Sequence, residues 1–304
     1  LGGSGTIRAG MWFLVAEFAA FVAFASVWGA ASDALGRRMP LAAVGAIGGA
    51  ACYLFLAAAP TIGLPYAGVI AVRLIGGAAT IGAFSLAITA LADLSGGHGR
   101  NMGAAGIAIG LGAALGSTLG GRLADADPLY PLVAAAATLV LVAGLFLTVA
   151  EGLPSTDPLR VGDIFDRIRG RPTLLVPFAF GFIDRMTAGF FALVGVYYFR
   201  ESFGLDATGA GLALAAFFVP FALLQYPAGV LSDRIGRTIP VVVGSICFGL
   251  GIVAVGIAPT LALAIAAMVA VGALGALVAP ATMALVTDIA TPETRGAALG
   301  GFHV

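Results

Sequence analysis

Charged residues are scarce in this sequence, and lysine is absent. Only 10% of the 304 residues are charged, and all 15 basic residues are arginine. Soluble domains carry about 25% charged residues, and a chain that is 60% hydrophobic has more apolar mass than one water-soluble core can hold. These proportions exclude a soluble enzyme, a nucleic-acid-binding domain, a disordered tail and a coiled coil. They predict an all-α polytopic membrane protein.

Cysteine and net charge are also low. The two cysteines, Cys52 and Cys247, lie inside apolar runs, so we interpret them as packing residues rather than as a disulfide or metal ligands. The 15 acidic residues balance the arginines, and no net field attracts nucleic acid. The sequence has no nucleotide-binding P-loop, His/Cys metal cluster or Ser-His-Asp set, so we expect neither enzymatic activity nor a cofactor.

Long apolar runs dominate the chain instead. A bilayer core needs about 20 apolar residues per helix. Nine runs satisfy this, and we predict spans at 10–32, 39–59, 64–92, 101–122, 129–150, 173–199, 208–232, 239–258 and 261–289.

One long polar stretch, residues 151–172, separates the fifth and sixth runs. Its second part is compatible with either an amphipathic helix on the membrane surface or a solvated linker. Ten arginines lie on the same side as this stretch and three on the opposite side. The positive-inside rule therefore predicts a cytoplasmic linker in a multi-pass protein of the cell membrane.

The sequence repeats itself along its length. Residues 29–38 recur at 229–238, an offset of 200, and Pro60-Thr61 recurs as Pro259-Thr260, an offset of 199. Asp93 with Arg100 recurs as Asp288 with Arg295, an offset of 195. Both copies of each motif fall on the same predicted side, which indicates parallel repeats.

The repeat also predicts the domain organisation. We expect an N-terminal half at 1–150 (helices 2 to 6), the linker at 151–172, and a C-terminal half at 173–304 (helices 7 to 10 and the start of 11). On this hypothesis the chain is a fragment of a twelve-helix protein, without helices 1, 11 and 12.

The repeated loop resembles the signature G-x-x-x-D-x-x-G-R-R of the major facilitator superfamily of secondary transporters. The resemblance implies two pseudo-symmetric six-helix halves that work by alternating access, with these loops latching the halves together on the cytoplasmic side. The alternative is that the loops only hold static hairpins. The residues that carry the gating motif are Gly29, Asp33, Gly36, Arg37, Arg38, Gly229, Asp233, Gly236 and Arg237.

Charged partners for this motif lie on the same side. Helices that begin near Asn101 and Gly296 present positive dipole ends, which attract the carboxylates at the ends of the motif helices. Gly36 and Gly236 permit tight turns, and Arg37 and Arg237 could pair with a carboxylate. The partner residues are Asp93, Arg100, Asp288 and Arg295.

Two charges of opposite sign fall at matching depths inside apolar runs. Arg73 is followed by glycine-rich turns, similar to the second motif of the family, and it lies roughly 13 Å along its helix at 1.5 Å per residue. Glu17 lies roughly 10 Å along another helix that runs the same way. A buried arginine needs a partner or a wet cavity, so we hypothesise a Glu17–Arg73 pair. The alternative is that Arg73 meets backbone carbonyls and Glu17 the headgroups.

Three further polar residues are cavity or coupling candidates. Asp184 falls near the middle of its predicted span and could carry a proton or contact substrate, and Arg185 follows it. Adjacent helical residues diverge by about 100°, so these two side chains cannot both point the same way. Gln225 could line a substrate path.

Glycines at 112, 116 and 120 predict one close helix-packing stripe. The segment resembles the antiporter motif G-x-x-x-G-P-x-x-G-G, with Ser117 in place of the proline. Glycine packing alone and exporter identity both remain open.

The resemblance implies proton-coupled efflux of small amphipathic compounds, driven by the proton gradient. An uptake symporter for a sugar, organic acid or similar metabolite is the alternative, because Pro292–Gly296 resembles a sugar-porter loop. A non-transporting membrane scaffold is a remote alternative. We expect a small-molecule substrate and the lipid bilayer as partners, no nucleic acid, and a monomer when full length.

Overall fold

The computed structural model describes residues 3–95, 98–150, 166, 170, 172–190, 194–291, 294–295 and 298–299. Inside the helices, the side chains of residues 3–7, 181 and 184–190 also lie outside this description. The described chain is helical, without β-strands. The helices are α1 (Gly3–Leu35), α2 (Met39–Ala58), α3 (Tyr66–Asp93), α4 (His98–Ala126), α5 (Tyr130–Thr148), α7 (Leu175–Phe190), α8 (Val196–Phe203), α9 (Ala207–Ile235), α10 (Thr238–Gly256) and α11 (Leu261–Ile289), with a 3-10 turn at Pro172–Leu174.

Eight of the described helices are long and apolar enough to cross a membrane: α1 to α5 and α9 to α11. Each coincides with a predicted span and differs from it by a few residues at its ends. The chain is therefore a multi-pass membrane protein.

The sixth predicted span, 173–199, includes residues 191–193, which lie outside the described residues. Its described parts form two helices, α7 with 16 residues and α8 with 8. Of the polar stretch 151–172, only residues 166, 170 and 172 are described, so the predicted surface helix lies outside the described residues.

Contacts divide the chain into two compact units. Unit 1 comprises 1–93, 129–185 and 290–304, and unit 2 comprises 94–128 and 186–289. This division differs from the halves at 1–150 and 173–304, because α4 packs extensively against α9. The halves are defined by the sequence repeat, and as functional domains they remain a proposal.

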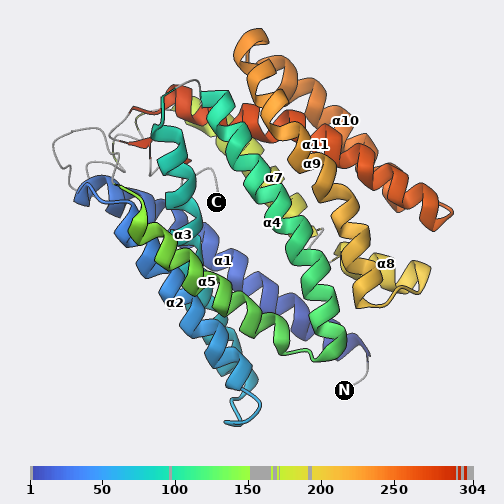
Figure 1. The fold of residues 1–304 in the computed structure, drawn as a ribbon. Helices are drawn as coiled ribbons and strands as arrows, with labels where there is room; N and C mark the ends of the chain where they lie inside the picture. Colours follow the sequence, from blue (N-terminus) through green and yellow to red (C-terminus); the bar gives the residue numbers. More distant parts are fainter. Residues whose placement is uncertain are drawn as a thin grey trace. The chain divides into compact units, whose positions relative to one another are not determined.

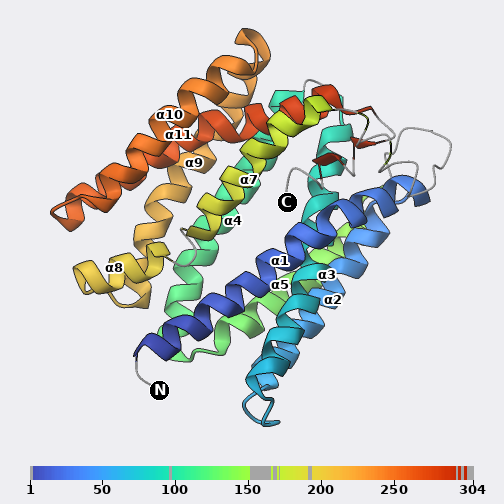
Figure 2. The same cartoon turned by 180° about the vertical axis from the view of Figure 1, so that it is seen from behind.

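In unit 1, α2 packs against both α3 and α5, and α1 packs against α3 (Figure 1 and Figure 2). Small residues allow this close approach: Ala43, Ala46, Ala83 and Ala143 form a buried cluster. A Cβ added at Gly45 would lie 2.6 Å from the carbonyl oxygen of Ala79. Small residues at contacts are typical of membrane helices, where dispersion contacts hold the bundle together.

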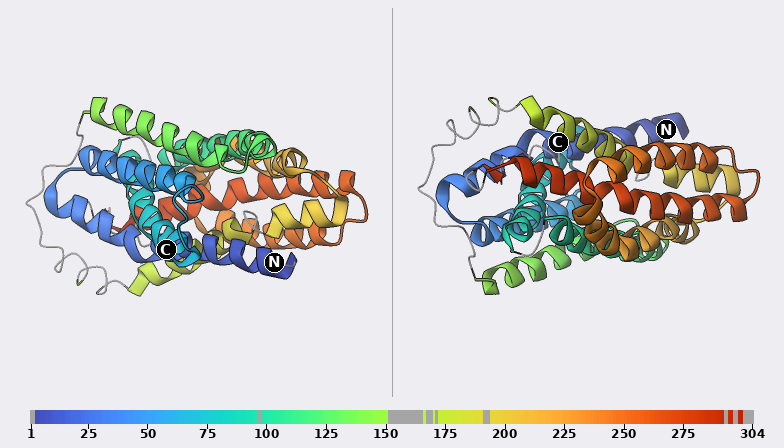
Figure 3. Two further views of the ribbon diagram at one scale, coloured as in Figure 1. Left: turned by 90° about the horizontal axis from the view of Figure 1, so that it is seen from below. Right: turned by 90° about the horizontal axis from the view of Figure 1, so that it is seen from above.

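In unit 2, α9 packs against α4 and α11, and α11 lies along α10 (Figure 3). Its core is more aromatic than that of unit 1. Phe217 stacks on Phe221 with ring centroids 5.4 Å apart, and Phe199 is 1% exposed in the same cluster. The core joins α8 to α9, α10 and α11.

Candidate functional site

The first charged cluster comprises Asp33, Arg38, Asp93 and Arg295, all in unit 1. Arg38 is its centre: Nη1 donates to Asp33 Oδ1 at 2.8 Å, and Nε donates to Asp93 Oδ2 at 2.7 Å. Arg295 Nη1 reaches the other oxygen of Asp93, Oδ1, at 3.3 Å. The side chain of Arg38 is only 2% exposed, so these two carboxylates compensate for the burial of its positive charge.

The turn after α1 brings these groups together. Gly36 has a φ of +62°, which glycine adopts without strain. Arg38 directly precedes α2 as its N-cap and also donates to Ser32 Oγ at 2.7 Å. The sequence leaves Arg37 as a possible partner of a carboxylate. In the structure Arg38 is that partner, and among the described residues the exposed Arg37 side chain has no recorded ion-pair partner.

The second charged cluster comprises Asp233, Arg237, Asp288 and His98, all in unit 2. Arg237 Nη2 lies 2.7 Å from Asp233 Oδ1, and Nε donates to Asp288 Oδ2 at 2.9 Å. His98 Nδ1 lies 2.8 Å from Asp288 Oδ1. The predicted pairing of Arg237 with Asp288 is therefore present.

Partial burial lowers the pKa of Arg237, but the hydrogen bonds and negative charge of Asp288 and Asp233 outweigh this effect and raise it overall. The guanidinium thus stays charged at any physiological pH. The turn before it uses Gly236, with a φ of +85°. Gly229 lies where a Cβ would come 2.2 Å from the carbonyl oxygen of Gly99, so α4 and α9 are in backbone contact at this motif glycine.

Asp233 also caps α4. Its two carboxylate oxygens accept the backbone N–H groups of Gly99 at 3.0 Å and Arg100 at 2.9 Å. This is the expected attraction between a carboxylate and a positive helix end. Arg100 contributes its backbone N–H, while its side chain is exposed. The matching contact of Asp33 with the segment near Gly296 falls outside the described residues.

An ion pair lies inside the spanning helices of unit 1. Arg73 Nη2 on α3 donates to Glu17 Oε2 on α1, so the pairing predicted from helix depth is present. The hydroxyl of Tyr53 lies 3.4 Å from Glu17 Oε1. The Arg73 guanidinium carbon is 4.4 Å from the ring centroid of Phe13 and 5.2 Å from that of Tyr53. Arg73 is 8% exposed, and these partners compensate for its burial.

The remaining three candidates have different outcomes. Asp184 and Arg185 belong to α7, but their side chains lie outside the described part of the chain. Gln225 on α9 is fully buried against α4, where a Cβ at Gly106 would lie 2.1 Å from its Oε1. Its amide nitrogen and oxygen have no hydrogen-bond partner among the described residues.

The glycine stripe predicted on α4 is wrong. Among the residues that the structure describes, a Cβ at 112, 116 or 120 would meet nothing within 4 Å. The close contacts with α9 fall instead on the face with Gly103, Gly106, Gly110 and Gly121, where an added Cβ would lie 2.1 to 2.7 Å from residues of α9. The four-residue spacing identified a regular stripe, but several stripes of a glycine-rich helix are equally small, and spacing does not show which one faces a partner.

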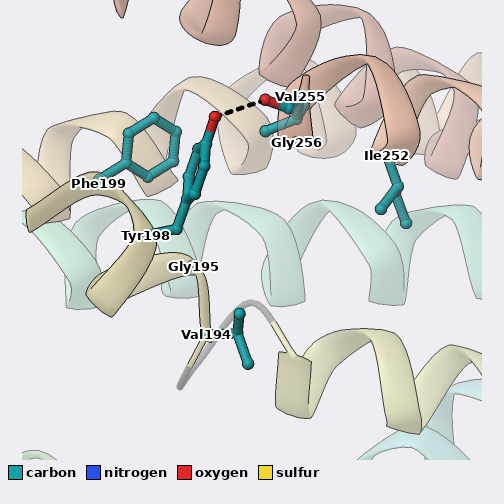
Figure 4. Close-up of a pocket in the computed structure, with 7 residues that line it drawn as sticks. All are labelled: Val194, Gly195, Tyr198, Phe199, Ile252, Val255 and Gly256. Carbon is teal, nitrogen blue, oxygen red and sulfur yellow. Dashed lines mark hydrogen bonds between the residues drawn. The ribbon is translucent and has the colours of Figure 1, made fainter. Parts of the chain in front are cut away.

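The described pockets are apolar. One, of about 60 Å³, lies between α8 and α10, where the hydroxyl of Tyr198 donates to the carbonyl oxygen of Val255 at 2.8 Å (Figure 4). It is smaller than the roughly 300–1,000 Å³ of ordinary ligand pockets. A groove of about 370 Å³ lies on α1 and α3 beside Trp28, whose Nε1 donates to the carbonyl oxygen of Ala78 at 2.7 Å. Neither pocket has a charged group among its lining residues.

The sequence analysis does not identify three residues that take part in these contacts. His98 lies between the predicted spans 64–92 and 101–122, yet it begins α4 and contacts Asp288. Tyr53 joins the Glu17 pair, and Asp125 accepts from the backbone and hydroxyl of Thr208 at 3.0 and 2.5 Å. For His98 a signal existed: it precedes Asn101 at a predicted helix start on the charged side.

These features define a polytopic α-helical membrane protein with a duplicated charged cluster and an intramembrane ion pair. A family model, described as Major Facilitator Superfamily, matches residues 4–198 and again 178–304. The chain belongs to the Major Facilitator Superfamily, which is a family of secondary transporters and not of enzymes.

The similarity to individual proteins is lower and covers only part of their length. The uncharacterized MFS-type transporter YfkF of Bacillus subtilis (strain 168) is 28% identical over 163 residues, which cover 50% of this chain and 40% of that protein. The chain thus matches less than half the length of this relative.

Solved structures share the fold. The human organic anion transporter MFSD10 (TETRAN) has a TM-score of 0.73 at 21% identity, covering 97% of this chain and 73% of that one. The proton:xylose symporter XylE, from E. coli, has a TM-score of 0.73 at 18% identity, covering 100% and 77%.

Proposed function

We propose that this chain forms part of a proton-coupled exporter of small amphipathic compounds that works by alternating access. The observation that carries the coupling is the Glu17–Arg73 pair inside the spanning helices α1 and α3. Of the acidic side chains that the structure describes, Glu17 alone lies in the interior of a spanning helix.

The pair has the chemistry that coupling needs. A carboxylate pairs with an arginine only in its charged form, so a proton on Glu17 would release Arg73 for another partner. The rings of Tyr53 and Phe13 offer Arg73 contacts that do not depend on that proton. Protonation therefore changes the contact between α1 and α3. Asp184 is a second proton-site candidate.

The two charged clusters support the gating part of the proposal. Each joins residues from both sequence halves: Asp93 to Arg295, and Asp288 to His98. Such contacts favour one state of a two-state equilibrium, because they form only when the joined ends are close. We assign both clusters to the cytoplasmic side of the cell membrane, with the proton gradient as driving force, no cofactor, and a monomer as the transporting unit.

Export is the first candidate for direction because of the glycine-rich α4 and its similarity to the antiporter motif, apart from Ser117. Uptake of a sugar or similar metabolite is the second candidate. It is favoured by the likeness of Pro292–Gly296 to a sugar-porter loop and by the fold shared with the symporter XylE.

The test uses the full-length protein in proteoliposomes that contain a pH-sensitive dye. Ethidium movement driven by an imposed pH gradient is the expected result. Glu17→Gln should abolish the dependence on the gradient, whereas the matched control Glu201→Gln, at an exposed residue of α8, should retain it. Gradient-driven ethidium movement that is unchanged in Glu17→Gln would count against the coupling role. Xylose-dependent proton uptake without ethidium movement would favour the second candidate.

A further inference from the structure

The two charged clusters have the same contacts around Asp93 and Asp288 except at one position. In the first, Asp93 accepts from Arg38 Nε through Oδ2 and from Arg295 Nη1 through Oδ1. In the second, Asp288 accepts from Arg237 Nε through Oδ2 and contacts His98 Nδ1 through Oδ1. His98 therefore holds the place that Arg295 holds in the first cluster.

This exchange changes the charge balance. The first cluster has two carboxylates and two guanidinium groups, so it is neutral. The second has two carboxylates and one guanidinium group, so it carries one excess negative charge until His98 is protonated. Arginine is charged at every accessible pH, whereas histidine changes its charge between about pH 5 and 8.

We propose that His98 makes the second charged cluster a proton-sensitive latch between α4 and the ends of α9 and α11. Protonation of the imidazole neutralises the cluster and tightens the contact with Asp288, so acidification on that side favours the closed arrangement. The first cluster is its pH-independent counterpart. The inference rests on the proposed function, because a latch regulates transport only if the joined ends separate during alternating access.

The charged groups around His98 act in both directions. Asp288 on α11 and Asp233 on α9 attract an imidazolium, while Arg237 and the positive end of the α4 dipole repel it. The attraction is direct, since Asp288 Oδ1 is the atom in contact. Arg237 already engages Asp288 through the other oxygen.

Two more arginines, Arg100 on α4 and Arg234 on α9, have exposed side chains at this end. The side chains of His98 and Asp288 are 29% and 38% exposed. For such a pair we expect protonation to change the ratio of closed to open molecules about two- to five-fold.

The experiment measures this ratio by electron–electron double resonance in the full-length protein in lipid vesicles. Nitroxide labels are placed at Ala104→Cys on α4 and Leu231→Cys on α9, both exposed and uncharged, in a background with Cys52→Ser and Cys247→Ser. Distance distributions are compared at about pH 8 and about pH 6, the range over which histidine titrates.

The short-distance population should rise on acidification in the parent protein and in His303→Gln, a control that alters the only other histidine of the chain. It should be low and pH-independent in His98→Gln, and high and pH-independent in His98→Arg, which copies the first cluster. A pH response that survives His98→Gln, or a parent protein without a response, overturns the inference. Ethidium transport by the same vesicles tests the proposed function separately, because a transporter without the latch would still move ethidium.

Discussion

Asp233 and Asp125 cap each other's helices. Asp233, near the end of α9, accepts the N–H groups of Gly99 and Arg100 at the start of α4. Asp125, near the end of α4, accepts the N–H and hydroxyl of Thr208 at the start of α9. The antiparallel pair is thus fixed at both ends by carboxylates on positive helix ends. Between these ends, glycines such as Gly103 and Gly110 let α4 lie close to α9.

Removing the Asp233 cap should destabilise unit 2. Asp233→Ala leaves two N–H groups of α4 without an acceptor, and we expect a loss of about 1–2 kcal/mol in the free energy of unfolding. Asp233→Asn keeps one acceptor oxygen and should retain most of that stability. Thermal unfolding in detergent would measure both. Equal melting temperatures for the Ala and Asn variants would show that the cap contributes little.

Arg38 and Arg37 provide a matched test of the first charged cluster. Arg38→Ala removes the buried guanidinium from Asp33 and Asp93, and breaking a buried ion pair by removing one partner costs about 3–5 kcal/mol. Arg37→Ala alters an exposed side chain and should change stability by less than about 0.5 kcal/mol. The measurement is the urea or thermal midpoint of each variant in the same detergent. A larger loss for Arg37→Ala would contradict the assignment.

The position of Arg38 shows how far the internal sequence repeat predicts which residues are equivalent in the two charged clusters. The offset of 200 aligns Arg37 with Arg237, yet the functional equivalent of Arg237 is Arg38. The turn after α1 is one residue longer than the turn after α9, since α2 begins at Met39 and α10 at Thr238. The change of offset from 200 to 199 at Pro60 and Pro259 already indicated a one-residue difference, but not where it falls.

The depth of a charged residue along its helix predicted a contact better than the regular spacing of glycines did. Glu17 and Arg73 were paired because a charge in an apolar span has few alternatives, so burial narrows the choice of partner. The α4 glycines and Gln225 lacked such a constraint. Which face of a glycine-rich helix packs depends on the partner helix, and α9 selects the face that holds Gly110.

Two glycines of α4 therefore predict opposite effects of the same substitution. A Cβ at Gly110 would lie 2.6 to 2.8 Å from the Cβ, Cα and N atoms of Ala222, two of them backbone atoms that cannot move aside. Gly110→Ala should cost about 1–3 kcal/mol through overpacking. At Gly112 no described residue lies within 4 Å of an added Cβ, and Gly112→Ala gains helix propensity, so it should be neutral or stabilising by up to about 1 kcal/mol. The melting temperatures of the two variants give the answer, and a reversed order would mean that α4 packs through the other stripe.

Gln225 offers the sharpest distinction between a structural and a functional role. Its side chain is fully buried at the α4–α9 contact, and both polar atoms of its amide lack a partner among the described residues. An unsatisfied buried amide costs about 1–3 kcal/mol, and Met has nearly the same length without hydrogen-bonding groups. Gln225→Met should therefore raise the melting temperature.

The consequence for transport separates the two roles. If the amide pairs with substrate or water when α4 and α9 move apart, Gln225→Met should lower the rate of ethidium transport several-fold while it stabilises the resting protein. Glutamine would then be retained at a cost in stability because the open state uses it. Unchanged transport in a stabilised Gln225→Met protein would remove Gln225 from the substrate path, and a lower melting temperature would show that the amide has a partner in the folded state.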